Sequence, residues 1–166
     1  MSENQANQVG GNFAFASGAL ATATTTSAVK TTVVIPYTID GQFASKAITD
    51  NMSIAYTSAT AAYGEATNGA FTGGANGSTR LYGIYLDSAG ALTVFPGPIV
   101  DSVALSNGAA PLLWPNDQRR KVMIGVLRIA LTAGTTFIPG TTLLGAAGVT
   151  ASFLNTSCLP GEPLTS

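Results

Sequence analysis

The stretch VMIGVLRIAL, residues 122–131, decides the fold class, because it is apolar on both faces of an extended chain. Arg128 is its one charged side chain. Strands that are buried on both faces have near-continuous runs of Val, Ile and Leu, whereas a strand with one wet face alternates apolar and polar residues. The stretch therefore predicts a central strand, covered on both sides by its own domain or by a partner.

Upstream of this strand, RLYGIYLDSAGALTVFPG, residues 80–97, predicts a β-hairpin. Its loop, residues 87–90, suits a type I turn that ends in a left-handed glycine, Gly90. Apolar side chains again occupy both faces of the first strand. Pro96 and Pro98 are expected to end the second strand, because proline cannot donate a ladder hydrogen bond.

A second hairpin is predicted for TTVVIPYTIDGQFASKAI, residues 31–48, around an Asp-Gly pair that supplies the two positive φ angles of a type I′ turn. Further short strands are expected in TTFIPGTTL, residues 135–143, around its Pro-Gly turn, and in GVTASFL, residues 148–154. No convincing amphipathic helix accompanies them. The sequence therefore predicts an all-β fold, a single β-sandwich or barrel-like domain.

The N-terminal part, residues 1–32, is predicted to be an extended arm, because its polar start is followed by Thr- and Ala-rich sequence that favours extended backbone. Phe13 and Phe15 are its aromatic residues, and they are too few to form a core. We expect them to contact a neighbouring subunit or, as an equally open alternative, to pack into their own domain. Residues 33–157 are expected to form the β-rich domain, and residues 158–166 an irregular Pro-rich tail.

Composition points to a protein that associates. The 166 residues suit one domain, and 46% of them are hydrophobic. Only 9% are charged, against about 25% in typical soluble domains, and the formal net charge is −1. Because low net charge promotes association, we expect an obligate assembly.

The sequence predicts no enzymatic activity. The chain has no His, the side chain most used for general acid–base catalysis. Turns and chain ends account for most carboxylates, which leaves Glu65, Asp101 and Asp117 as candidates for a glycosidase pair, but no spacing pairs them. With no Cys/His cluster and no calcium-loop motif, we expect no metal and no cofactor. A single cysteine, Cys158, fits synthesis in a reducing cytoplasm.

Membranes and nucleic acids are not expected partners. No apolar run approaches the roughly 20 residues of a membrane-spanning helix, and the first residues, MSENQANQVGG, do not resemble a signal peptide. The cluster of Arg119, Arg120 and Lys121 is too narrow for nucleic acid in a chain with a pI of about 5.1. It is either a solvated turn or a docking point for an acidic partner surface. Trp114 is either a core side chain or an interface anchor.

Four stretches resemble the head decoration, or cement, proteins of tailed bacteriophages. They are YTIDGQFASKAITDN, LYGIYLDSAGALTV, WPNDQRRKVMIGVLRI and TTFIPGTTLLGAAGVTASF, and they lie in this order across roughly residues 33–154. The resemblance implies a small β-rich protein that binds the outside of an expanded capsid, often as a trimer. It also implies arms or tails that contact the major capsid protein, and no catalytic residues.

We therefore expect a structural virion protein, made in the host cytoplasm, that stabilises the capsid exterior as a homotrimer. The candidate contact residues for the major capsid protein or for another copy of the chain are Phe13, Phe15, Trp114, Arg119, Arg120 and Lys121. The alternative is a head-fibre or tail adhesin module that binds host-surface glycans. In that case Tyr63, Phe71 and Tyr82, in and beside the glycine-rich stretch 64–79, would be exposed and would stack on sugars.

Overall fold

The computed structural model describes residues 11–56, 66, 68–115 and 120–156. The first ten residues of the predicted arm lie outside the described residues. So does the predicted tail, residues 158–166, which begins with Cys158. The elements in chain order are β1 (Phe13–Ala14), β2 (Leu20–Thr22), β3 (Ala28–Thr31), β4 (Ile35–Ile39), β5 (Gln42–Lys46), β6 (Met52–Ser53), β7 (Phe71–Thr72), β8 (Ser78–Asp87), β9 (Leu92–Asp101), α2 (Ser102–Ser106), β10 (Lys121–Leu131), β11 (Thr136–Phe137) and β12 (Val149–Leu154).

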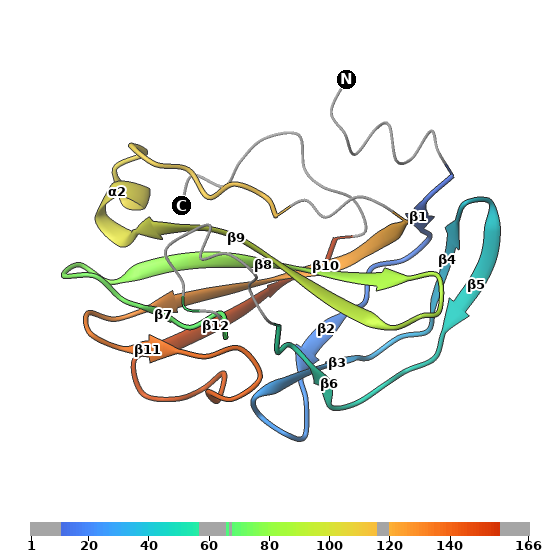
Figure 1. Ribbon diagram of the computed structural model, residues 1–166, viewed down its shortest axis with the longest axis horizontal. Coiled ribbons are helices and arrows are strands. Elements are labelled where there is room, and N and C mark those ends of the chain that lie inside the picture. Colours follow the sequence, from blue (N-terminus) through green and yellow to red (C-terminus); the bar gives the residue numbers. More distant parts are fainter. Residues whose placement is uncertain (1–10, 57–65, 67, 116–119, 157–166) are drawn as a thin grey trace.

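Strand β10 is the centre of the fold (Figure 1). It lies between β8 and β12 in an antiparallel sheet of order β12-β10-β8-β9. Leu127 and Ile129 are buried in a core cluster on one face of this sheet, and Met123 and Val126 in a second cluster on the other. The prediction of a central strand that is covered on both sides is confirmed.

Three small sheets cover the first face of the four-stranded sheet. Their strand orders are β1-β4-β5, β2-β3-β6 and β11-β7, and their inward side chains share one core cluster with the large sheet (Figure 1). This cluster includes Ala14, Leu20, Val29, Ile35, Tyr37, Met52, Phe71, Leu127, Ile129 and Phe137. The all-β prediction is confirmed, and within the described residues the sheets stay open and form no closed barrel.

The second face is covered by α2 and by the chain that follows it. Leu105 of α2 and Leu112 are buried there against Leu81 and Tyr85 of β8. Helix α2 was not predicted from the sequence, because its five residues are too few to show a helical period. Together the two covers explain why both faces of β8 and β10 are apolar.

Both predicted hairpins are present. Strands β4 and β5 are joined at Asp40 and Gly41, whose φ angles of 52° and 75° are those of a type I′ turn. Strands β8 and β9 are joined by a turn in which Gly90 has a φ of 74°. The Asp87 side chain accepts hydrogen bonds from the backbone N–H groups of Ala89 and Ala91 in that turn, which fixes it locally.

The expectation that Pro96 and Pro98 end the second strand was wrong. Strand β9 continues through both prolines to Asp101. Strand β9 is the edge strand of its sheet and pairs with β8 alone, so a proline in it does not remove a hydrogen bond to a second strand. The register of β8 with β9 also shifts between Arg80 and Tyr82. Position in the sheet, which the local sequence does not show, makes the prolines acceptable.

Residues 13–31, which the sequence analysis assigned to an arm, form β1, β2 and β3. Strand β1 pairs with β4, and β3 pairs with β2 and β6 of the same chain. Leu20 and Val29 are buried in the main core cluster. Of the two alternatives for Phe13 and Phe15, the structure places their backbone within the domain.

Gly77 and Gly108 form a matched pair for testing how the chain enters β8. Both have a left-handed backbone, with φ angles of 80° and 69°. A Cβ at Gly77 would lie 2.4 Å from the carbonyl oxygen of Leu131, whereas one at Gly108 would meet no atom within 4 Å. We expect Gly108→Ala to cost about 1–2 kcal/mol for the left-handed backbone alone.

Gly77→Ala should lower the free energy of unfolding by about 1–3 kcal/mol more, because the end of β10 must move to admit the methyl group. Urea unfolding of the two variants and the parent measures the difference. Equal destabilisation by the two substitutions would contradict the close approach of Gly77 to β10.

Candidate functional site

The outer face of the small sheet β1-β4-β5 carries aromatic side chains. Phe13 of β1 lies opposite Thr38 of β4, which in turn lies opposite Phe43 of β5. Residues directly opposite one another in antiparallel strands point to the same face. The next row, Ala14 and Tyr37, points inward and is buried in the core cluster. The row with the two phenylalanines therefore points outward.

Phe13, Phe15 and Phe43 form one cluster, which we call the aromatic patch. The ring centroids of Phe13 and Phe15 are 4.7 Å apart at an interplanar angle of 62°, and those of Phe15 and Phe43 are 5.9 Å apart at 55°. Phe15 is 55% exposed and Phe43 is 70% exposed, while Phe13 is half-buried. Clustered aromatic rings in solvent are typical of a protein-interaction surface.

More exposed apolar side chains lie at the open end of the β4–β5 hairpin. Val34 precedes β4, and Ile48 follows β5, while the pairing of Ile35 with Lys46 brings the two segments together. Val34 is 53% exposed and Ile48 is 61% exposed. Strand β5 is also an edge of its sheet, and its residues are all exposed or half-buried. The surface around the patch is thus well suited to contact another protein chain.

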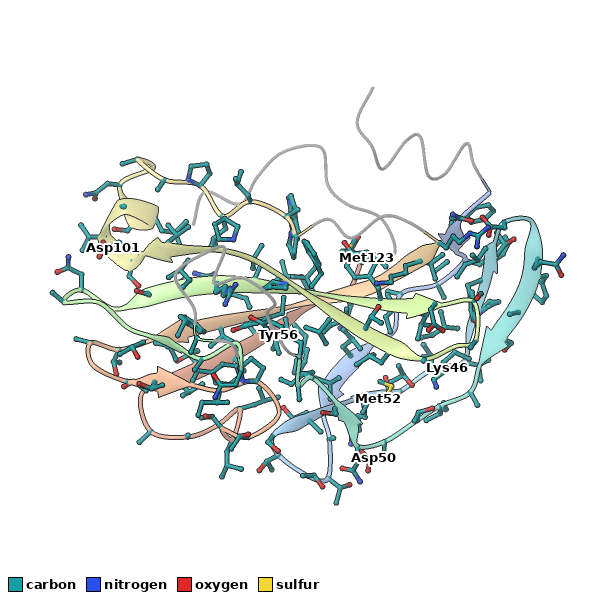
Figure 2. The ribbon with its side chains drawn as sticks, in the orientation of Figure 1. Lys46, Asp50, Met52, Tyr56, Asp101 and Met123 are labelled. Atoms are coloured by element: carbon teal, nitrogen blue, oxygen red, sulfur yellow. The ribbon has the colours of Figure 1, made fainter. Side chains whose placement is uncertain are left out.

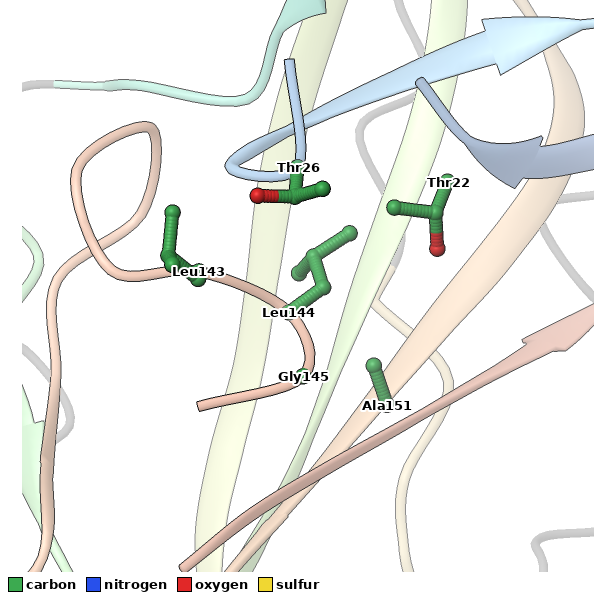
Figure 3. A pocket seen from close by; sticks show the side chains of 6 residues that line it. All are labelled: Thr22, Thr26, Leu143, Leu144, Gly145 and Ala151. Atoms are coloured by element: carbon green, nitrogen blue, oxygen red, sulfur yellow. The ribbon is translucent and has the colours of Figure 1, made fainter. Parts of the chain in front are cut away.

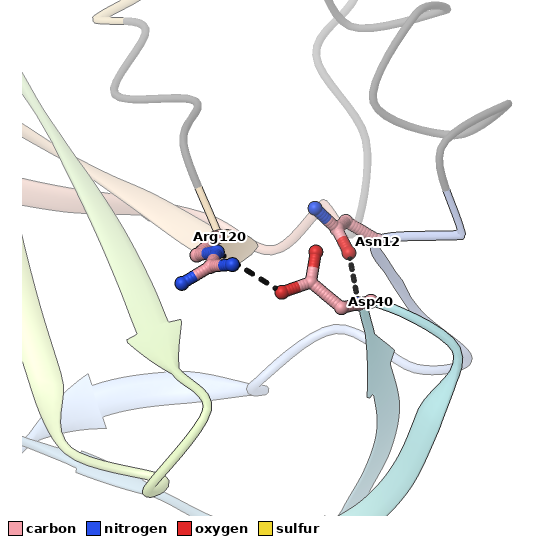
Figure 4. Close-up of polar contacts among 3 residues, drawn as sticks. All are labelled: Asn12, Asp40 and Arg120. Atoms are coloured by element: carbon pink, nitrogen blue, oxygen red, sulfur yellow. Dashed lines mark hydrogen bonds and ion pairs between the residues drawn. The ribbon is translucent and has the colours of Figure 1, made fainter.

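A polar contact closes the other end of the same hairpin (Figure 4). The Arg120 Nε lies 3.1 Å from Asp40 Oδ2, and the Asp40 N–H donates a 2.5 Å hydrogen bond to Asn12 Oδ1. Both charged side chains are largely exposed, so the ion pair contributes little to stability. Its effect is to hold Arg120 beside the sheet that carries the aromatic patch.

The remaining candidate contact residues are not gathered at this place. Trp114 is half-buried and packs against the second core cluster, on the other face of the large sheet. Lys121 is half-buried at the start of β10, opposite Asp87 of β8. Arg119 lies outside the described residues. The structure therefore groups Phe13, Phe15 and Arg120 around one small sheet, and adds Phe43, which the sequence analysis did not select.

Of the three carboxylates considered for catalysis, the structure describes Asp101, which caps α2 (Figure 2). Its Oδ1 accepts hydrogen bonds from the N–H groups of Ala104 and Val103, at 3.1 and 2.9 Å. The bond from Ala104 is the main cause that lowers the pKa of this carboxyl, with Val103 and Asn76 adding to it. Its Oδ1 thus holds the helix, while its Oδ2 accepts a hydrogen bond from Asn76 Nδ2 at 3.3 Å. Glu65 and Asp117 lie outside the described residues.

The glycan-binding alternative required exposed aromatic residues near the glycine-rich stretch, and this expectation was wrong for two of the three. Phe71 is 3% exposed and Tyr82 is 1% exposed, because both belong to the core and pack against Phe137. The guanidinium of the buried Arg80 lies 5.7 and 5.3 Å from their ring centroids. The third, Tyr63, lies outside the described residues.

One open cavity of about 480 Å³ lies between the loop that precedes β12 and the turn between β2 and β3 (Figure 3). It is lined by Thr22, Thr26, Leu143, Leu144, Gly145 and Ala151. The lining offers methyl and hydroxyl groups, with no titratable side chain and no aromatic ring. Such a cavity can accept an apolar contact but contains no group that takes up or releases a proton near neutral pH.

Comparison with known proteins gives no relative: no protein-family model, no curated protein and no solved structure matches the chain. Among the described residues, no group of three or more His, Cys, Asp or Glu side chains could hold a metal ion. The described part of the chain also contains no helix long and apolar enough to cross a membrane.

Alanine substitutions at two phenylalanines can distinguish the exposed patch from the buried core by their effect on stability. Phe43→Ala should change the free energy of unfolding by less than about 1 kcal/mol, because its ring is mostly in solvent. Phe71→Ala, made as the buried control, should cost about 3–5 kcal/mol. Urea unfolding of both variants tests this, and a large loss with Phe43→Ala would place its ring in the core.

The role of Asp101 predicts a specific pH dependence. Its pKa is lowered in the folded state, so its contribution to stability is present above the unfolded pKa and is lost as pH falls through the folded pKa. Asp101→Asn keeps a good helix cap without a titrating group. We expect this variant to lose less stability than the parent between about pH 4 and pH 2, in urea unfolding at each pH. An identical acid dependence in both proteins would refute the assignment.

Proposed function

We propose that this chain is a structural virion protein that binds the outside of a phage capsid and stabilises it as a homotrimer. The observation that carries the proposal is the aromatic patch, in which Phe15 and Phe43 stand in solvent on a β-sheet that is anchored to the core. A sheet fixed in this way presents the rings with little loss of conformational freedom on binding.

The energetics suit a protein that works by contact. Burial of apolar surface contributes about 25 cal/mol per Å², and aromatic anchors carry much of the affinity of interfaces. A protein that binds only the assembled shell lowers the free energy of that shell by mass action. When the same modest contact is repeated over a symmetric shell, the stabilisation accumulates.

The surroundings of the patch supply the rest of an interface. Val34 and Ile48 are further exposed apolar side chains at the open end of the same hairpin, and the Arg120–Asp40 pair is a polar contact at its tip. An apolar centre with a polar rim is the usual anatomy of a protein–protein contact. We propose the major capsid protein and other copies of this chain as the partners, with the protein made in the host cytoplasm and placed on the capsid exterior.

A capsid-binding assay tests the proposal. The parent protein should bind bare phage capsids and raise their melting temperature. Phe15→Ala combined with Phe43→Ala should weaken binding by at least about tenfold, because loss of a central interface aromatic costs about 2 kcal/mol or more. The weakened variant should also lose most of the gain in melting temperature.

Leu143→Ala is the matched control, because Leu143 is 51% exposed but lies at the cavity of Figure 3 and not at the patch. It should bind capsids as the parent does. Wild-type affinity in the double phenylalanine variant would exclude the patch as the contact surface. A parent protein that leaves capsid stability unchanged would overturn the proposed function itself.

A further inference from the structure

Arg128 places a positive charge near the middle of the central strand. It lies opposite Leu81 of β8 and Ser152 of β12, so it points to the face of the large sheet that α2 covers. Its side chain is half-buried. The aromatic patch belongs to the sheet that covers the opposite face, so this charge is separate from the proposed capsid contact.

The Arg128 guanidinium lacks the partners that such a group usually has. Its Nε is buried, and no described residue accepts a hydrogen bond from it. A buried donor without a partner costs free energy, and the cost is larger when the group is charged. Arg128 also lines a surface pocket, where an acceptor from outside the described fold can reach the end of the guanidinium.

The guanidinium borders a surface pocket that has further donors. This pocket of about 270 Å³ is lined by Thr79, Ser102, Leu105, Ser106, Arg128 and Ala130. Ser106 Oγ already donates to the carbonyl oxygen of Val103 at 3.0 Å. The hydroxyls of Thr79 and Ser102 are then the donors that can join Arg128 in binding an acceptor.

We propose that this pocket binds a carboxylate, supplied by an Asp or Glu side chain of a partner protein. The Nη–H groups at the end of a guanidinium can donate to both oxygens of a carboxylate, and a hydroxyl such as that of Ser102 can donate to the same group. Asp101, which directly precedes the pocket residue Ser102, is engaged by the helix N–H groups and by Asn76.

A side chain of a partner fits the pocket better than a large free ligand does. The pocket is small and open, and it lies where α2 meets the sheet. A single acidic side chain that projects from a docked surface can reach such a place.

The test uses the full chain and nuclear magnetic resonance. N-acetyl-glutamate N-methylamide serves as the probe, and N-acetyl-glutamine N-methylamide as the neutral control, both at constant ionic strength. The side-chain Nε–H signal of Arg128, identified by its loss in Arg128→Gln, should shift saturably with the glutamate probe and not with the glutamine probe. The backbone N–H signals of Ser102 and Leu105 should move with it.

Two variants complete the design. Ser102→Ala should weaken binding of the glutamate probe by about tenfold, the change expected for one hydrogen bond to a charged group. Arg120→Gln removes one positive charge at the exposed ion pair and should leave binding unchanged. If the Nε–H signal of the parent does not respond, or responds equally to both probes, solvent water satisfies Arg128 and the carboxylate site is refuted.

Discussion

The need to cover both faces of β10 governs the rest of the structure. A strand with buried side chains on both sides cannot belong to a sheet that has one wet face, so the chain must build two covers. The three small sheets form one cover, and α2 with residues 107–115 forms the other. Among the described residues, the large apolar side chains that are buried all belong to the two core clusters under these covers.

The same constraint explains why the aromatic patch is exposed. The sheet β1-β4-β5 uses its inner face, with Tyr37 and Ile35, to cover the large sheet. Within the part of the chain that the structure describes, no further layer covers its outer face, where Phe15 and Phe43 lie. In a chain with only 9% charged residues, rings left in solvent favour association with another protein.

The carboxylates of Asp101 and Asp87 accept hydrogen bonds from backbone N–H groups, which is a structural role.

Local signals in the sequence predicted the features that depend on local physics. The apolar run 122–131 gave the central strand, and Asp40-Gly41 gave a hairpin, because periodicity and turn chemistry act over a few residues. Features that depend on distant neighbours were predicted wrongly or missed. The prolines of β9 are accommodated because that strand is an edge, and Phe71 and Tyr82 are buried by strands far away in the sequence.

The candidate site was only partly accessible to sequence analysis for the same reason. Phe13 and Phe15 were selected because they are the aromatic residues of a polar segment. Phe43 was missed, although the two-residue turn fixes its position opposite Thr38 and so onto a definite face. No sequence pattern shows that α2 lies beside Arg128, because the two are brought together by the pairing of β8 with β9 and β10.

The central claim is that this protein acts by non-covalent association with copies of itself and with a larger protein assembly. The native mass of the purified chain, measured by light scattering over a wide range of concentrations, tests the self-association directly. The account predicts three times the mass of one chain, held on dilution. A single-chain mass at every concentration would contradict it.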